Sequence, residues 1–137
     1  MKRALSWVLL PALAGCASMR AEPPCRAPAQ QPLIVIELFF GRDIAGRQPL
    51  TDSEWSAFAA STVATEFPDG FTVIDGEGQW LDPHSHAPVR ERSKILIVSV
   101  ARDGNLASRI ARISDAYRTE FHQESVGVMI YNACGSF

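Results

Sequence analysis

The sequence lacks a long apolar run, an excess of basic residues and the common catalytic and nucleotide-binding motifs, and each absence argues against a class of protein. No stretch of about 18 or more apolar residues marks a membrane-spanning helix. Lys and Arg number 13 against 15 Asp and Glu, so no positive excess exists for binding nucleic acid or acidic lipid. No Gly-x-Ser-x-Gly, His-Glu-x-x-His, phosphate-loop or dinucleotide motif is present. What remains, 137 residues of which 47% are hydrophobic, predicts one globular domain.

The chain begins with a segment typical of bacterial export signals. Lys2 and Arg3 supply a positive start, and residues 4–13 supply an apolar stretch too short to span a bilayer. The sequence LAGC at residues 13–16 follows at once and resembles the lipobox of bacterial lipoproteins. That resemblance implies cleavage after residue 15 and lipidation of Cys16. An ordinary secretory signal with an incidental cysteine is the alternative.

Lipidation of Cys16 would anchor the chain to a membrane of the cell envelope. Each buried methylene of an acyl chain contributes about 0.8 kcal/mol, so two or three chains hold the protein permanently. Ala17 stands where an aspartate would favour the inner membrane, and the resemblance to lipoprotein sorting rules therefore implies the outer membrane, facing the periplasm. Residues 1–15 are then the signal peptide, residues 16–32 a proline-rich membrane tether and residues 33–137 a single α+β domain.

Two cysteines, Cys25 and Cys134, remain once Cys16 carries lipid. A disulfide is the expected state of such a pair in an oxidising compartment, whereas two lone thiols make a poor metal site. Closing a loop of roughly 110 residues would stabilise the fold by about 4 to 5 kcal/mol in the chain-entropy model. The alternative is two unpaired thiols.

Apolar patterns predict four strands and two helices. We expect strands at 33–40, 71–75, 94–100 and 125–131, and helices at 52–66 and after Asp103 or Asn105. Thr51 and Glu54 have the spacing of a capping box. The order is that of a ferredoxin-like split βαβ fold (β-α-β-β-α-β), an α+β class with a four-stranded antiparallel sheet and two helices on one face. We place the first and third strands at the centre, side by side and parallel, and the fourth antiparallel beside the first.

Several segments together resemble the bacterial family named domain of unknown function 3574. They cover essentially the whole domain and comprise ELFFG at 37–41, Trp55, FPDG at 67–70, DGEGQW at 75–80, ERSK at 91–94, QESV at 123–126 and CGSF at 134–137. The resemblance implies a small exported protein, often a lipoprotein, and brings no assigned activity.

Glu37 is the sharpest candidate for chemistry, because it is the one carboxylate in an otherwise apolar central strand. It shares a face with Leu33, Val35 and Phe39, and a ferredoxin-like sheet leaves that face bare of helices. Glu37 could therefore line a ligand pocket or act as a catalytic base. The alternative is a salt bridge with Lys94 or an arginine.

Five further residues are binding candidates, each with a plainer alternative. Lys94 could bind an anion or be a strand-end lysine whose head group reaches solvent. Trp80, next to Gln79, could be a ligand platform or a core residue. Arg90 could clamp a carboxylate or belong to a solvated hairpin face. Arg42 follows the first strand, a frequent site position that equally fits a plain loop.

We expect no metal and no cofactor. His84 and His86 stand two residues apart and could share a metal, but two nitrogens bind weakly without further ligands, and nothing in the sequence brings His122 close.

These observations predict a lipid-anchored envelope protein that binds a small molecule or a partner without catalysis. The alternative is a cofactor-independent enzyme of the dimeric α+β barrel type acting on a small organic substrate, with Glu37 as general base. A homodimer through the bare sheet face and a purely structural envelope role also remain open.

Overall fold

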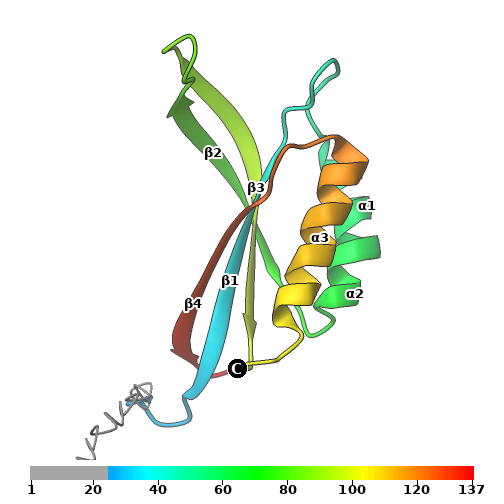
Figure 1. Ribbon diagram of the computed structural model, residues 1–137. Coiled ribbons are helices and arrows are strands. Elements are labelled where there is room, and N and C mark those ends of the chain that lie inside the picture. Colours follow the sequence, from blue (N-terminus) through cyan, green and yellow to red (C-terminus); the bar gives the residue numbers. More distant parts are fainter. Residues whose placement is uncertain (1–24) are drawn as a thin grey trace, which may run out of the picture.

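A computed structural model describes residues 25–137, so the signal segment and the predicted lipidation site Cys16 lie outside the described residues. The elements follow in the order β1 (Gln31–Gly41), α1 (Asp52–Phe58), η1 (Ala59–Val63), α2 (Ala64–Glu66), β2 (Thr72–Leu81), β3 (Pro88–Val100), α3 (Leu106–Phe121) and β4 (Gly127–Gly135). The helices lie on one face of the four-stranded sheet and leave the other face open (Figure 1). The predicted α+β, ferredoxin-like class is confirmed.

The sheet has the strand order β2-β3-β1-β4, and every neighbouring pair is antiparallel. The expectation that the first and third strands run parallel is therefore wrong. The helical crossover returns the chain so that β2 runs in the direction of β1, and the hairpin then reverses the chain once more, which makes β3 antiparallel to β1.

The first helical segment is continuous over the predicted residues 52–66 but contains a π-helical turn at Ala59–Val63. Its start is the predicted capping box, in which the Thr51 hydroxyl accepts from the Glu54 backbone N–H and the Glu54 carboxylate accepts from the Thr51 N–H.

The β2–β3 hairpin is longer than predicted. β2 runs six residues beyond Asp75, to Leu81, and β3 begins at Pro88 rather than Lys94. Gly76 and Gly78 stay in regular register, and a Cβ on Gly76 would come within 2.9 Å of Ile95 Cδ1. Gly76 therefore leaves room for the Ile95 side chain, and neither glycine forms a bulge.

Alternation along β1 separates the core from the open face. Ile34, Ile36, Leu38 and Phe40 are buried under the helices. Phe40 lies in an aromatic cluster with Trp55, Phe58, Tyr117 and Phe121. The intervening side chains face away from the helices and are only half-buried; the register groups them with residues of all four strands, namely Val35, Glu37, Phe39, Thr72, Ile74, Gly76, Gly78, Trp80, Val89, Glu91, Ser93, Ile95, Ile97, Ser99, Gly127, Met129, Tyr131 and Ala133. We call this surface the open face.

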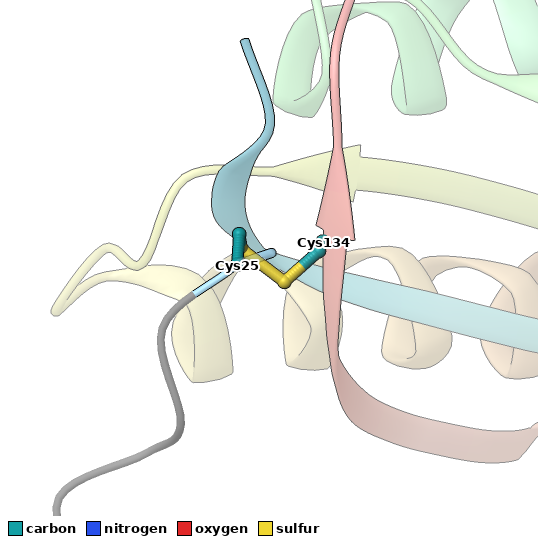
Figure 2. Close-up of a disulfide and its surroundings, with 2 residues drawn as sticks. All are labelled: Cys25 and Cys134. Atoms are coloured by element: carbon teal, nitrogen blue, oxygen red, sulfur yellow. A yellow bond between two sulfur atoms is a disulfide. The ribbon is translucent and has the colours of Figure 1, made fainter. Parts of the chain in front are cut away.

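A disulfide joins Cys25, just before β1, to Cys134 in β4, which is the pairing that the sequence predicts. Figure 2 shows the bridge between the incoming segment and the last strand. Cys25 and Cys134 are 109 positions apart in the sequence but close in space. Cys134 pairs with Pro32 in the antiparallel β1–β4 ladder, and the chain from Cys25 therefore passes beside it.

Among residues 25–137, no helix has the length and apolar character needed to cross a membrane.

Candidate functional site

One end of the open face contains a hollow of about 660 Å³. It lies between the β2–β3 hairpin, the loop after β1 and the connection from α3 to β4. The lining residues are Phe39, Gly41, Asp43, Ala45, Gly78, Trp80, Val89, Glu91, Ser93, His122, Gln123, Glu124 and Ser125. Its volume falls within the range of small-molecule pockets, about 300–1,000 Å³.

Trp80 gives the hollow its largest apolar surface. The side chain is 46% exposed although it is a tryptophan in a regular strand. It lies opposite Val89 across the hairpin and shares the hollow with Phe39 of β1. This exposure excludes a buried core position, one of the two roles predicted for Trp80.

Hydrogen bonds between distant segments fix the walls of the hollow. The Asp43 N–H donates to Glu91 Oε1 at 3.1 Å, and Gln123 Nε2 donates to the Asp43 carbonyl at 2.5 Å. Tyr117 Oη donates to the Gly41 carbonyl at 2.7 Å. These bonds tie the loop after β1 both to β3 and to the end of α3, so the hollow is a formed feature of the fold.

Glu91 depends on the absence of a side chain at Gly41. Its carboxylate lies over Gly41, and a Cβ built there would overlap Glu91 Oε1. The strand residue Gly41 therefore makes room for this carboxylate at the edge of the hollow.

His122 enters the hollow because α3 ends at this residue. It adopts the left-handed conformation with φ 53°, and its N–H donates to the Arg118 carbonyl. A left-handed residue at this position is a common way for a helix to end, although glycine is the usual occupant. Chain reversal here brings His122 to the hollow, away from His84 and His86.

Glu37 lies on the open face but does not line the hollow. It accepts a hydrogen bond of 2.7 Å from Tyr131 Oη, and this bond raises the pKa of Tyr131. The predicted alternative, a salt bridge with Lys94, is wrong, because Lys94 pairs with Phe40 in the ladder and therefore points to the helix side. Alternation along β1 assigns residues 37 and 40 to opposite faces.

The buried side chains of Lys94 and Arg42 form one cluster with two exposed carboxylates on the helix side of the sheet. Lys94 Nζ lies 2.8 Å from Asp52 Oδ1 and 2.5 Å from Asp75 Oδ1. Arg42 NH1 lies 3.1 Å from Asp52 Oδ1, and the guanidinium also donates to the Leu50 carbonyl. The side chains of Lys94 and Arg42 are only 7% and 8% exposed. Lys94 is thus neither a strand-end lysine nor open to solvent.

The charges of this cluster stabilise one another. The hydrogen bond from Lys94 and the positive charges of Lys94 and Arg42 hold the pKa of Asp52 below its usual value. Burial lowers the pKa of Lys94, but the hydrogen bonds and charges of Asp52 and Asp75 outweigh that effect and raise it overall. The cluster joins β1, α1, β2 and β3, so its evident role is structural.

Gln79 and Arg90 contact each other on the exposed far end of the hairpin. Arg90 Nε donates to Gln79 Oε1 at 2.8 Å, and Arg90 NH1 lies 4.0 Å from Glu77 Oε1. Both residues alternate away from Trp80, on the opposite face of β2 and β3. This arrangement matches a solvated hairpin face.

The loop between β2 and β3 is organised by Asp82 and not by its histidines. Asp82 Oδ1 accepts from the backbone N–H groups of His84 and Ser85 and from the Ser85 hydroxyl. These bonds lower the pKa of Asp82, with those from Ser85 the largest cause. No group of three or more His, Cys, Asp or Glu residues within residues 25–137 could hold a metal ion.

The six predicted site residues therefore fall into four places, and only Trp80 lines the hollow. Sequence reasoning did not choose Asp43, Glu91 or His122 as binding residues. Glu91 was recognisable in principle, because a hairpin that places Trp80 opposite Val89 puts residue 91 on the same face two positions away. The positions of Asp43 and His122 depend on loop packing, which leaves no periodic signal.

The architecture defines a small α+β domain with helices on one side and an open, hollowed sheet face on the other. The chain belongs to the family described as Protein of unknown function (DUF3574), whose model matches residues 35–137. No curated protein matches the sequence.

Two solved structures share the fold, both of a phage SAM lyase. The complex with S-methyl-5'-thioadenosine has a TM-score of 0.56 and 16% identity, over 77% of this chain and 90% of the lyase. The apo state has a TM-score of 0.55 and 14% identity, over 85% of this chain and 97% of the lyase. At these identities the likeness shows a common fold.

Proposed function

We propose that this protein is a lipid-anchored component of the bacterial cell envelope whose domain binds a small molecule in the hollow, without catalysing a reaction. The half-exposed Trp80 in a preformed hollow is the observation that carries the proposal. A large aromatic side chain left accessible to solvent loses the burial that normally stabilises it, and binding a ligand restores that burial.

The disulfide supports this arrangement by orienting the domain. Cys25 lies nine positions after the proposed anchor Cys16, so the Cys25–Cys134 end of the domain faces the membrane. β1 runs from that end to Gly41 at the hollow, a distance of roughly 33 Å at the usual rise of a strand. The hollow then opens away from the membrane, toward ligands of the periplasm.

Mass spectrometry of the protein purified from bacterial membranes tests the anchor. We expect an N-terminal Cys16 carrying a diacylglyceryl group, and a Cys16→Ser variant that no longer partitions into detergent. An intact thiol on Cys16, or cleavage at another bond, would contradict lipidation.

Fluorescence of the membrane-extracted chain tests the ligand site. A library of small periplasmic metabolites is screened for changes in tryptophan emission, with Trp80→Phe as the matched variant. A ligand of the hollow should alter the emission of the parent chain and not of Trp80→Phe, because Trp55 is buried in the core. Responses that persist in Trp80→Phe would place binding elsewhere.

The second candidate function is a cofactor-independent enzyme acting on a small organic substrate. It is supported by the fold that the chain shares with an enzyme, the phage SAM lyase. Glu37 is poorly placed as its base, because the carboxylate is bonded to Tyr131 and lies outside the hollow. Incubation with SAM, followed by chromatography, separates the two functions. Turnover that Glu91→Gln abolishes would favour the enzyme over the binding module.

We also propose that a second copy of the chain packs on the part of the open face outside the hollow, around Met129 and Tyr131. Both side chains are large and exposed, at 53% and 44%, and exposed apolar surface of this kind is typical of an interface. Met129 is 53% exposed on this face, and its neighbour Ile130 is 54% exposed on the other. Sedimentation in density-matched detergent should show a dimer that Met129→Glu dissociates and Ile130→Glu does not; a monomeric parent chain would contradict this pairing.

A further inference from the structure

The carboxylates among the residues that line the hollow have no basic counterpart in the lining. Three carboxylate residues line it, Asp43 from the loop after β1, Glu91 from β3 and Glu124 from the connection to β4. His122 is the remaining titratable residue of the lining, and neither arginine nor lysine occurs among the lining residues. Carboxylates arranged around a concave surface create a negative potential inside it.

The same hollow contains the side chain with the strongest attraction for cations. A tryptophan ring presents a negative face, and a cation placed against it gains electrostatic stabilisation that exceeds that of other aromatic residues. Trp80 is 46% exposed and has Glu91 on the same face of the hairpin. Phe39 and Val89 add apolar surface for the uncharged part of a ligand.

Hydrogen bonds hold the segments that carry these groups in place. Glu91 is fixed by the Asp43 N–H, Gln123 holds the Asp43 carbonyl, and Arg118 Nε donates to the Glu124 carbonyl at 3.0 Å. The acidic residues of the hollow form no cluster that could hold a metal ion within residues 25–137. Asp43, Glu91 and Glu124 come from three different segments around the hollow, an arrangement that suits a bulky cation with diffuse charge.

We propose that the hollow selects small organic cations, in which a quaternary ammonium or a similar alkylated group packs against Trp80 beside Glu91. This inference rests on the proposed function of the hollow as a ligand site. The carboxylates attract the cation without forming contact ion pairs, while the apolar wall excludes small hydrated metal ions.

Three probes of the same shape and different charge test the selectivity. Choline carries the cation. In tert-butylethanol (3,3-dimethylbutan-1-ol) a carbon atom replaces the ammonium nitrogen. The third probe, 3,3-dimethylbutanoate, is the anion of tert-butylacetic acid and is called tert-butylacetate below; it carries a negative charge. Binding to the full chain in a maltoside detergent is followed by saturation-transfer NMR at low salt. Choline should bind about tenfold more tightly than tert-butylethanol, and tert-butylacetate more weakly than both.

Three variants locate the effect. Trp80→Ala and Glu91→Gln should each weaken choline binding by about three- to tenfold, because each removes one source of attraction. Glu77→Gln is the matched control, since Glu77 lies on the same hairpin but on the opposite face and does not line the hollow. Unchanged thermal unfolding of Trp80→Ala and Glu91→Gln verifies that each is folded.

The outcomes separate this inference from the proposed function. Equal binding of choline and tert-butylethanol, both dependent on Trp80, would overturn cation selectivity and leave the ligand site standing. Preference for tert-butylacetate would do the same. Absence of binding by all three probes, or binding that neither Trp80→Ala nor Glu91→Gln alters, would overturn the inference; only a failed metabolite screen against Trp80 would overturn the site itself.

Discussion

Tyr131 donates a hydrogen bond from its phenol to Glu37 across the β1–β4 ladder, with 2.7 Å between Tyr131 Oη and Glu37 Oε1. The pair lies in the middle of the open face, beside Val35 and Met129. It supplies a hydrogen-bond partner for the one carboxylate of β1, and it connects the two strands that also carry the disulfide end of the domain.

Replacing Glu37 by glutamine should lower the pKa of Tyr131 toward the ordinary value of 10.0, because the hydrogen bond to Glu37 is the largest cause of its increase. Alkaline titration of phenolate absorbance measures this shift. The chain has two tyrosines, and a Tyr131→Phe variant identifies the signal of each. Glu77→Gln serves as the control for loss of a carboxylate, and identical titrations of Glu37→Gln and Glu77→Gln would refute the coupling.

The buried Tyr117 should make the domain sensitive to alkali. Burial is the largest cause that raises its pKa, while the unfolded chain releases the proton near pH 10.0. Because the folded pKa is the higher one, this stabilisation is complete below about pH 10 and is lost as the pH rises further. Urea unfolding between about pH 8 and 11 should show a midpoint that falls more steeply in the parent chain than in Tyr117→Phe. Parallel curves would show that Tyr117 does not cause the loss.

Acid should weaken the cluster around Lys94. The folded pKa of Asp52 is depressed below 3.8, so its contribution to stability is present above that pH and is lost as the pH falls through the folded value. The double variant Asp52→Asn/Asp75→Asn should lower the free energy of unfolding at neutral pH, since it leaves the buried cations of Lys94 and Arg42 without carboxylates. Chemical unfolding from pH 3 to 7 measures both effects.

The exposed Asp69 provides the control for that experiment. An Asp69→Asn variant removes a carboxylate from a turn without touching the cluster, and it should change the free energy of unfolding by less than about 0.5 kcal/mol. A double variant at Asp52 and Asp75 as stable as Asp69→Asn would mean that the buried cations find other partners.

A side chain at Gly41 should disturb the hollow more than the fold. Gly41→Ala places a Cβ where the Glu91 carboxylate lies, and the flexible end of Glu91 moves away, losing its bond from the Asp43 N–H. We expect binding in the hollow to weaken about tenfold, with a loss of stability near 1 kcal/mol.

Gly104→Ala is the control for Gly41→Ala, because a Cβ on Gly104 meets nothing within 4 Å. Ligand titration and thermal unfolding of the two variants give the comparison. Full affinity in Gly41→Ala would show that the position of Glu91 does not matter for binding.

Reduction of the Cys25–Cys134 disulfide should lower the free energy of unfolding by about 2 to 5 kcal/mol, since the bond closes a loop with a sequence separation of 109. Denaturant unfolding with and without reductant measures the loss. A Cys25→Ser/Cys134→Ser variant should match the reduced chain, and a variant as stable as the oxidised parent would contradict the role of the bond.

The fold was largely predictable, because its signals are local and periodic. A nearly continuous apolar run in residues 33–40 identified the central strand, and the Thr51–Glu54 capping box identified the start of the first helix. The hairpin was underestimated, since glycines and charged residues at 76–92 have low strand propensity, and only the pairing of β2 with β3 makes them strands.

The site was mostly not predictable. Trp80 was chosen because it is a large aromatic residue next to a polar one. The other candidates on the hairpin, Gln79 and Arg90, lie on the opposite face of β2 and β3. A salt bridge between Glu37 and Lys94 was one predicted alternative. The two side chains cannot meet, because Glu37 of β1 and Lys94 of β3 point to opposite faces of the sheet. Contacts such as Gln123 with Asp43 join residues 80 positions apart and leave no trace in local sequence.

The disulfide also determines how the domain bears load. Tension that enters at Cys25 passes through a covalent bond into β4 as well as along the backbone into β1, so both strands of the β1–β4 ladder are pulled from the same end. The strands then share the pull instead of sliding past or peeling from each other. With the lipid anchor that we propose at Cys16, a domain joined in this way would follow the membrane while its hollow keeps its shape.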